Sequence, residues 1–273
     1  MIKFAHICPT FYLSQFSQFN TAHLILAHLV ESCSTYRDFY STLNTSFPKI
    51  MDNSAFEMWK QKKPMYQSDK LIQMGKACNA EYIVMSDYPA EPWKKTAEAA
   101  EKLIPSIKEA GFKTFYVPQA ELGCVDDLLD SIEWGIDAGV DLIGLSILST
   151  PNAFDVSHSN RLQRYLSRRE IFRLLKERRP VDDHTIKKFH CLGMVDGPKE
   201  VELLTEFHPY IYSWDSSAAI WAGIHNLHFD TSPTGLIDGK FEKEVDFSYN
   251  KVLTSQQKES IICNINYIND LIK

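Results

Sequence analysis

The sequence lacks the features that mark secreted, zinc-binding and membrane-spanning proteins. Its six cysteines are scattered without a C-x-x-C pair, so neither a disulfide framework nor a thiolate zinc site is indicated. No apolar segment has the length of a signal peptide or a membrane span. We therefore expect a protein without a membrane partner that works in a reducing cytoplasm, that of the host cell if the gene is viral.

Internal repeats, low-complexity tracts and linkers are also missing. The chain has 273 residues, of which 44% are hydrophobic and 23% charged, as in an ordinary globular protein. We expect a single domain over residues 1–273. The net charge of −6 argues against wholesale coating of nucleic acid, but it leaves room for a local basic surface.

Short apolar runs alternate with helical segments along the chain. We predict strands at 2–7, 48–51, 82–85, 114–117, 141–147, 189–194 and 210–214. We predict helices at 21–31 (capped by Asn20 and Thr21), 68–78, 94–110, 124–138, 160–179, 199–207 and, at the C-terminus, 255–272. This alternation with short connections favours an α/β fold, a (β/α)8 TIM-like barrel. The eighth strand stays unassigned, because residues 225–252 are mixed and turn-rich.

Polar side chains stand at the ends of four predicted strands: Asp52, Asp87, Gln119 and Asp215. The carboxyl ends of barrel strands share one mouth, so we expect these side chains to lie close together. Two carboxylates on either side of a sugar–base bond can act as nucleophile and as proton donor or acceptor. An acid beside an amide can recognise the hydrogen-bonding edge of a guanine-like purine.

Six segments occur in an order that resembles the tRNA-guanine transglycosylase family: MDNSAFE, VMSDYP, FYVPQAEL, GVDLIGLSI, HCLGMVDGPKEVELL and YSWDSSAAIWAG. The resemblance covers about residues 49–223. It implies that Asp215 is the nucleophile that bonds to the sugar carbon and that Asp52 is the acid/base carboxylate. It further implies that Asp87 and Gln119 recognise the purine and that Gly144 lies in the strand that lines the base pocket.

The departures from the family point to a particular branch of it. The C-x-C-x-x-C zinc site with a later His is absent, and Asn53, Ser54 and Ala55 replace the family's Ser-Gly-Gly. A small, zinc-less chain of this kind resembles the phage enzymes that exchange guanine in DNA for a 7-deazaguanine such as preQ0. The expected partners are therefore DNA, or tRNA, and a free 7-deazaguanine base, without a cofactor. Whether the chain is a monomer or a homodimer stays open.

The segment 160–179 carries eight basic residues against two acids. Its basic residues include Arg161, Arg164, Arg168 and Arg169. Such a helix either contacts nucleic-acid phosphates or is a solvated face, and its place after a long strand-end loop favours phosphate contact.

Structural roles compete with the functional ones at each candidate residue. Asp215 before two serines could cap a helix, and Asp52 and Asp87 could stabilise turns. Phe56, near the acids, is a candidate to stack on an extruded base, whereas His190 fits strand-end packing.

Two histidines, His225 and His228, have the spacing of a shared helix face but lack a third ligand, so we predict no metal site. The competing functions are the same exchange on tRNA, a non-catalytic nucleic-acid-binding subunit and a hydrolase of free nucleosides.

Overall fold

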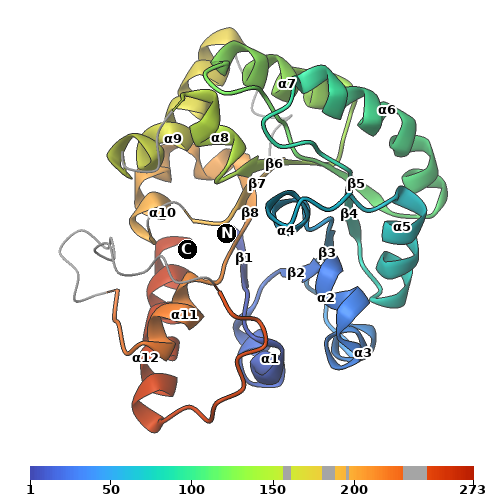
Figure 1. The fold of residues 1–273 in the computed structure, drawn as a ribbon. Helices are drawn as coiled ribbons and strands as arrows, with labels where there is room; N and C mark the ends of the chain where they lie inside the picture. The colour runs from blue at the N-terminus through green and yellow to red at the C-terminus, as the bar shows by residue number, and fades with distance from the viewer. Residues whose placement is uncertain (156–160, 180–187, 195–196, 230–244) are drawn as a thin grey trace.

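Eight parallel strands form the centre of the computed structural model, which describes residues 1–155, 161–179, 188–194, 197–229 and 245–273. The strands are β1 (Lys3–His6), β2 (His23–Leu26), β3 (Lys49–Asp52), β4 (Tyr82–Val84), β5 (Lys113–Tyr116), β6 (Leu142–Ser146), β7 (Phe189–Leu192) and β8 (Ile211–Ser216). They pair in the order β1-β8-β7-β6-β5-β4-β3-β2, with every pair parallel. Helices form a ring around the sheet (Figure 1). The predicted (β/α)8 TIM-like barrel is confirmed.

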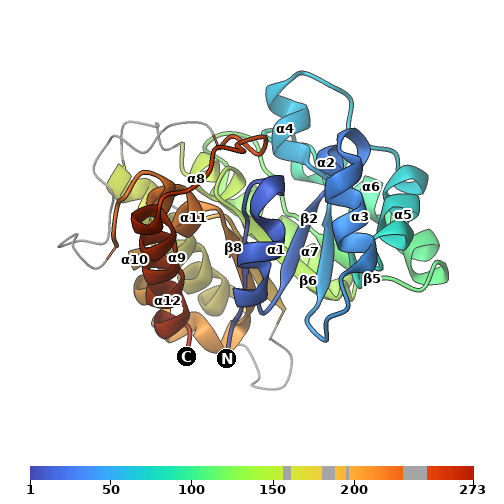
Figure 2. The ribbon, with the colours of Figure 1, turned by 90° about the horizontal axis from the view of Figure 1, so that it is seen from below.

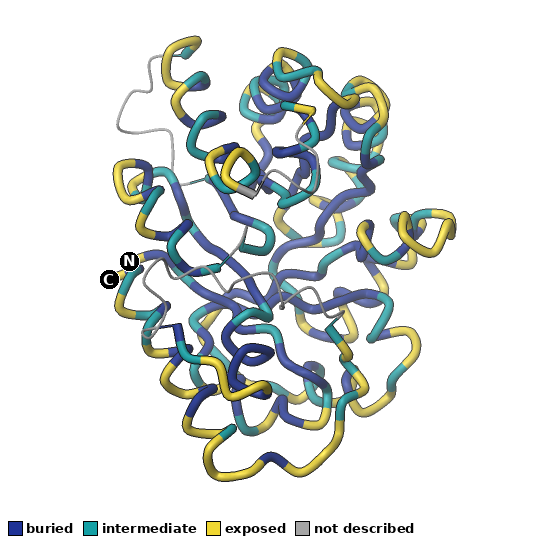
Figure 3. Tube along the Cα trace, turned by 60° about the vertical axis from the view of Figure 1, so that its left-hand side comes forward, coloured by how far each residue is buried: buried dark blue, intermediate teal, exposed yellow. Residues whose placement is uncertain are grey.

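The outer layer consists of helices of very different lengths. They are α1 (Leu13–Phe16), α2 (Ala27–Ser32), α3 (Ser34–Thr42), α4 (Ala55–Lys60), α5 (Ser68–Ala77), α6 (Trp93–Glu109), α7 (Val125–Asp137), α8 (Ser149–Ala153), α9 (Arg161–Arg178), α10 (Lys199–Leu203), α11 (Ala218–Ile224) and α12 (Ser255–Leu271), with 3-10 turns η1 (Thr10–Tyr12), η2 (Ser17–Phe19) and η3 (Thr205–Tyr210). Buried backbone runs through the strands, whereas exposed backbone lies on the outer helices and loops (Figure 3). Within the described residues, no helix combines the length and the apolar character needed to span a bilayer.

The eighth strand is β2, which lies in a segment predicted to be a helix. All four residues of β2 are buried, and they pair with β3 from His23 opposite Lys49 to Leu26 opposite Asp52. Only the end of the segment is helical, as the short α2. The prediction of a helix over 21–31 was wrong because a continuous apolar run, buried on both faces, has no period that separates strand from helix.

The barrel closes between β1 and β2 through the loop before β2. The backbone N–H groups of Thr21 and Ala22 donate to the Phe4 carbonyl over 2.9 and 3.1 Å. The Thr21 hydroxyl accepts from Phe4 N–H at 2.7 Å, and the Asn20 side chain accepts from His6 N–H at 2.9 Å. The predicted capping role of Asn20 and Thr21 was therefore wrong, because these side chains satisfy the edge of β1 instead.

The C-terminal helix α12 packs closely against α11. Thr254 and Gln257 form a capping box at its start, which fixes where the helix begins. Ile261, Ile265 and Ile268 are buried as their spacing predicts, and the predicted helix at 255–272 is confirmed apart from its last residue.

We predict that Gly223→Ala destabilises the fold by separating α11 from α12. A Cβ at this position would lie 2.4 Å from the backbone nitrogen of Ile261 and 2.6 Å from its Cα. Overpacking of this kind costs about 1–3 kcal/mol, measured as the free energy of unfolding in urea. Adding Ile261→Ala removes the equally close contact with the Ile261 side chain but leaves the loss in place, because the clashes with the backbone atoms remain. Recovery of stability in the double variant would contradict this contact.

Candidate active site

The four polar residues predicted at strand ends come together at one end of the barrel. Asp52 is the last residue of β3, Asp215 lies within β8, and Asp87 and Gln119 follow β4 and β5. The negative charges of Asp215 and Asp87 both act on Asp52, and Gln119 donates a hydrogen bond to Asp87. The shared mouth predicted from the sequence is therefore present.

Asp215 is held by two donors on a single oxygen. Its side chain is almost buried, and Oδ1 accepts from His190 Nε2 at 2.9 Å and from Gly193 N–H at 3.2 Å. The other oxygen, Oδ2, has no donor among the described residues. The alternative that Asp215 caps a helix is wrong, because Ser217 occupies the N-cap of α11 and Asp215 still belongs to the strand.

His190 fixes the orientation of Asp215 from the neighbouring strand. Its Nδ1 lies 2.7 Å from the Ser213 hydroxyl, on the other side of the ring from Asp215. A carboxylate oxygen accepts, so Nε2 is the donor in the contact with Asp215, and Nδ1 and the Ser213 hydroxyl share the second hydrogen bond. The interpretation of His190 as packing alone was incomplete. The sequence holds no local signal for this contact, which joins residues 25 positions apart.

Asp87 is the acceptor at the centre of a buried amide network. Asn53 Nδ2 donates to Asp87 Oδ1 and to the Met85 carbonyl, both at 2.6 Å, and Gln119 Nε2 donates to Asp87 Oδ2 at 2.5 Å. Burial raises the pKa of Asp87 to about 6, although both amide hydrogen bonds favour the charged form. The buried Gln119 Oε1 has no hydrogen-bond partner among the described residues. It is therefore an acceptor that a ligand with an N–H group could satisfy.

Asp52 carries the most strongly perturbed pKa among these acids. Burial raises this pKa well above its usual range, and the negative charges of Glu57, Asp215 and Asp87 raise it further. The Ser54 N–H donates to Asp52 Oδ2 at 2.8 Å, so the predicted turn interaction is present as well. The carboxyl group of Asp52 nevertheless keeps its proton to a higher pH than an ordinary aspartic acid does.

Glu57 is a fourth carboxylate at this site, and it was missed in the sequence. Burial and the charge of Asp215 raise its pKa, while Lys60 opposes them. Acids are common in the first turn of a helix because they interact favourably with the helix dipole. Glu57 fits that role in α4, so its sequence position does not indicate an active-site carboxylate.

Two further candidates lie in different surroundings. A Cβ at Gly144 would lie 2.6 Å from the Phe115 ring and 2.9 Å from Leu192, so the missing side chain makes room for protein atoms. Gly144 is opposite His190 in the sheet, and His190 is opposite Ser213, two residues before Asp215 on β8. Phe56, in contrast, is 44% exposed on α4, the helix that directly follows Asp52.

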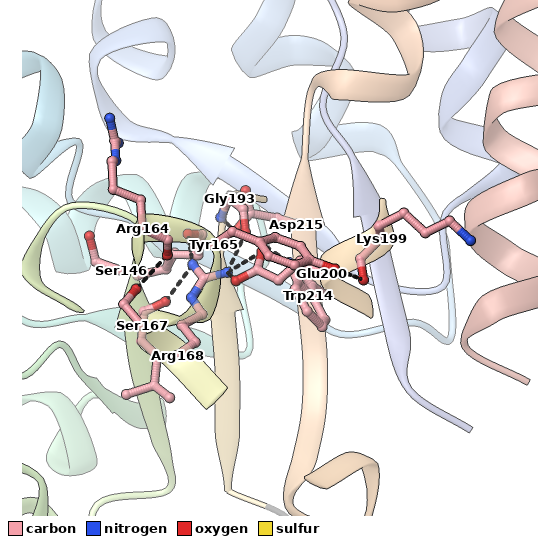
Figure 4. Close-up of polar contacts among 12 residues, drawn as sticks. Ser146, Arg164, Tyr165, Ser167, Arg168, Gly193, Lys199, Glu200, Trp214 and Asp215 are labelled. Atoms are coloured by element: carbon pink, nitrogen blue, oxygen red, sulfur yellow. Dashed lines mark hydrogen bonds and ion pairs between the residues drawn. The ribbon is translucent and has the colours of Figure 1, made fainter. Parts of the chain in front are cut away.

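Most basic side chains of α9 are matched by carboxylates. Arg169 pairs with Glu206 at 2.6 Å. Similar pairs join Arg173 to Glu170 and Glu177, Arg178 to Asp126 and Asp130, and Arg179 to Asp137. Arg164 points away from the Asp215 cluster (Figure 4), while the side chain of Arg161 lies outside the described residues. Carboxylates thus already offset the charge of these exposed arginines, and phosphate contact by Arg169 stays a prediction.

Arg168 is fully buried, so its predicted contact with phosphates is wrong. Its guanidinium donates to Glu200 at 3.1 Å, to the Gly193 carbonyl at 2.9 Å and to the Leu145 carbonyl at 2.8 Å. It also donates to the Leu192 carbonyl. Figure 4 shows this group beside the Gly193 segment, with Asp215 next to it. Arg168 thus joins the ends of β6 and β7 and holds the peptide that contacts Asp215.

The two histidines that were considered as metal ligands have other contacts. His225 lies edge-on to the Trp221 ring, and His228 Nε2 lies 2.7 Å from the Ser260 hydroxyl. Within the ranges that the structure describes, no three His, Cys, Asp or Glu side chains gather in a way that could hold a metal ion. Asp230, next to this pair in sequence, lies outside the described residues.

Comparison with known proteins gives no relative that would assign this site. No protein-family model matches the chain, and no curated protein matches it significantly.

We predict that breaking the Arg168–Glu200 pair costs far more stability than breaking a surface pair on the same helix. Glu200→Gln leaves a buried guanidinium without its counter-charge, and we expect a loss of about 3–5 kcal/mol. Arg169→Met removes a half-exposed pair and costs about 1 kcal/mol or less. Urea unfolding measures both, and equal losses would show that the buried pair does not hold β6 and β7.

We predict a pH-dependent gain in stability from Asp87→Asn. The folded-state pKa of Asp87, about 6, exceeds the ordinary unfolded value of about 3.9, so its protonated form stabilises the fold at low pH. This contribution is full below about pH 4 and is lost as the pH rises through 6. The stability of the variant relative to wild type should thus grow between pH 4 and pH 7 by about 3 kcal/mol at most. A difference in unfolding free energy that does not change with pH contradicts the prediction.

Proposed function

We propose that this chain is a base-exchange glycosyltransferase that replaces guanine in DNA with a 7-deazaguanine. The observation that carries the proposal is that Asp215 and Asp52 lie at the same mouth in different surroundings. One carboxylate is fixed on a single oxygen by two donors, while the other, within range of its charge, has a raised pKa. This division of roles is what a double displacement at a sugar carbon needs.

In the first step, Asp215 Oδ2 attacks C1′ of the target nucleotide. The bond between C1′ and N9 breaks, its electron pair leaves with guanine, and protonated Asp52 supplies the proton that neutralises the departing base. His190 and Gly193 hold Oδ1 throughout, so that Oδ2 is presented without rotation of the carboxylate. The product is an ester between Asp215 and the sugar.

The second step reverses the first with a different base. Asp52, now ionised, removes the N9 proton of the incoming 7-deazaguanine. N9 attacks C1′, the ester bond breaks, and Asp215 returns as a carboxylate. Two inversions give net retention at C1′, and atoms and charges balance without a cofactor.

Asp87 and Gln119 suit the recognition of the base. With a pKa of about 6, Asp87 is an acceptor at neutral pH, and the unpartnered Gln119 Oε1 offers a second acceptor. Guanine and 7-deazaguanine both present N–H donors on the same ring edge, so one pair of acceptors serves the leaving and the entering base. These two residues also match the purine-recognising pair of the family that the motifs resemble.

The choice of DNA over tRNA follows the resemblance to the small, zinc-less phage enzymes. The same chemistry on tRNA is the alternative, and both polymers belong in the assay. A non-catalytic binding subunit is the less favoured alternative, because it has no need of a carboxylate held as Asp215 is.

We predict that wild-type protein incorporates labelled preQ0 into guanine-containing DNA and that Asp215→Asn abolishes the incorporation. Without incoming base, denaturing gels of the wild type should show a covalent protein–DNA adduct that Asp215→Asn lacks. Asp52→Asn should slow exchange by about 100-fold or more, as for loss of a general acid. The exposed Asp69→Asn on α5 is the matched control and should retain full activity. Incorporation into tRNA alone would refute DNA as substrate, and activity in Asp215→Asn would refute the mechanism.

A further inference from the structure

Helix α4 exposes two large aromatic side chains at the mouth of the barrel. Phe56 and Trp59 are 44% and 46% exposed, while Ala55 and Met58 on the opposite side are buried. The spacing of 56 and 59 puts both rings on one helix face. Figure 2 shows α4 beyond the carboxyl ends of the strands. Asp52 ends β3, and Asp215 is the second-last residue of β8. Exposed neighbouring rings at such a place mark a binding surface.

A basic run continues directly from these rings. Lys60, Lys62 and Lys63 are all exposed. Lys60 lies one helical turn after Phe56 on α4, and Lys62 and Lys63 follow where the helix ends. Over residues 55–63, three lysines stand against one acid, Glu57, so the segment has a formal charge of +2 in a chain of net charge −6. Lys63 also lowers the pKa of His28 by its charge, although burial is the larger cause. The segment 55–63 therefore carries a net positive formal charge next to the two rings.

The end of α4 keeps a lysine where glycine is the usual residue. Lys62 has φ of 53°, and its N–H donates to the Trp59 carbonyl at 3.1 Å. The N–H of Lys63 donates to the Met58 carbonyl at 2.9 Å, which completes a Schellman end. A left-handed conformation costs an ordinary side chain about 1 kcal/mol. Lys62 adopts this conformation despite its cost, and its side chain adds a positive charge to the exposed surface.

Helix α9 offers no comparable surface in its described part. Four of its arginines, Arg169, Arg173, Arg178 and the adjoining Arg179, lie in ion pairs with carboxylates, and Arg168 is buried. Charge that is already paired contributes little to the attraction of a polyanion. The α4 face combines exposed lysines with exposed aromatic rings, which the described part of α9 does not do, so α4 is better suited to a nucleic-acid strand.

We propose that this α4 face, defined as Phe56, Trp59, Lys60, Lys62 and Lys63, holds the unpaired DNA strand beside the target nucleotide. The rings stack on bases that flank the nucleotide in the site, and the lysines contact phosphates. Binding surfaces for single strands combine these two elements. A duplex would hide the base faces that the rings need, so the occupant is an unpaired strand. The inference rests on the proposed function for the identity of the strand and extends it by naming where the strand lies.

The test measures binding of a fluorescent single-stranded DNA oligonucleotide to the full chain by anisotropy at several salt concentrations, without free base. For Lys60→Gln/Lys62→Gln/Lys63→Gln we expect weaker binding and a slope of log affinity against log salt that falls by about 2, since each phosphate contact adds about 0.7. Trp59→Ala should weaken binding roughly 5- to 100-fold and leave the salt slope unchanged.

A matched control removes the same charge elsewhere. Lys76→Gln/Lys102→Gln/Lys108→Gln alters three exposed lysines on α5 and α6 and should bind like wild type. If the first triple variant does not fold, Lys60→Gln/Lys62→Gly/Lys63→Gln replaces it, because glycine relieves the left-handed position. An unchanged salt slope, equal loss in the control variant, or tighter binding of duplex DNA or of RNA would each overturn the proposal.

Failure of this inference is distinct from failure of the proposed function. Binding that depends on the α4 face without base exchange supports the surface and removes the catalytic proposal. If base exchange occurs but DNA binding does not depend on the three lysines, the proposed binding surface is refuted and the catalytic proposal stands.

Discussion

The buried guanidinium of Arg168 is the contact on which the site depends. It gathers carbonyl oxygens from the ends of β6 and β7 and is neutralised by Glu200 from α10. The Gly193 carbonyl accepts hydrogen bonds from Arg168 and from Trp214 Nε1, and the Gly193 N–H donates to Asp215. A buried charge left unpaired would be costly, so the arrangement has little freedom. The direction of the Asp215 carboxylate is thereby set from outside the barrel.

Crowding of carboxylates determines the electrostatics of the mouth. Asp52 lies within range of three other acids, and its raised pKa follows from burial together with their charges. Asp215 differs from it in having donors, His190 and Gly193, on one oxygen. Similar groups at one mouth thus have different surroundings, burial and neighbouring acids around Asp52 and two donors on Asp215, and such differences are the usual physical basis for separate acid and nucleophile roles.

Charge is also distributed unevenly over the outside of the barrel. The arginines along α9 meet carboxylates from α7, η3 and α9 itself, which makes that side a network of surface ion pairs. The lysines that end α4 have Glu57 as the only acid within their own segment, residues 55–63. The catalytic proposal and the strand surface agree in placing nucleic acid over the same strand ends.

The sequence by itself determined the barrel and the polar residues at its mouth. Alternating segments predict a parallel sheet, and parallel strands bring their carboxyl ends together whatever the details of packing, so Asp52, Asp87, Gln119 and Asp215 could be grouped in advance. Tertiary structure alone decided that residues 23–26 form a strand, that Arg168 is buried and that His190 contacts Asp215. A strand buried on both faces has no distinguishing period, and contacts between side chains 25 or 32 positions apart leave no local pattern.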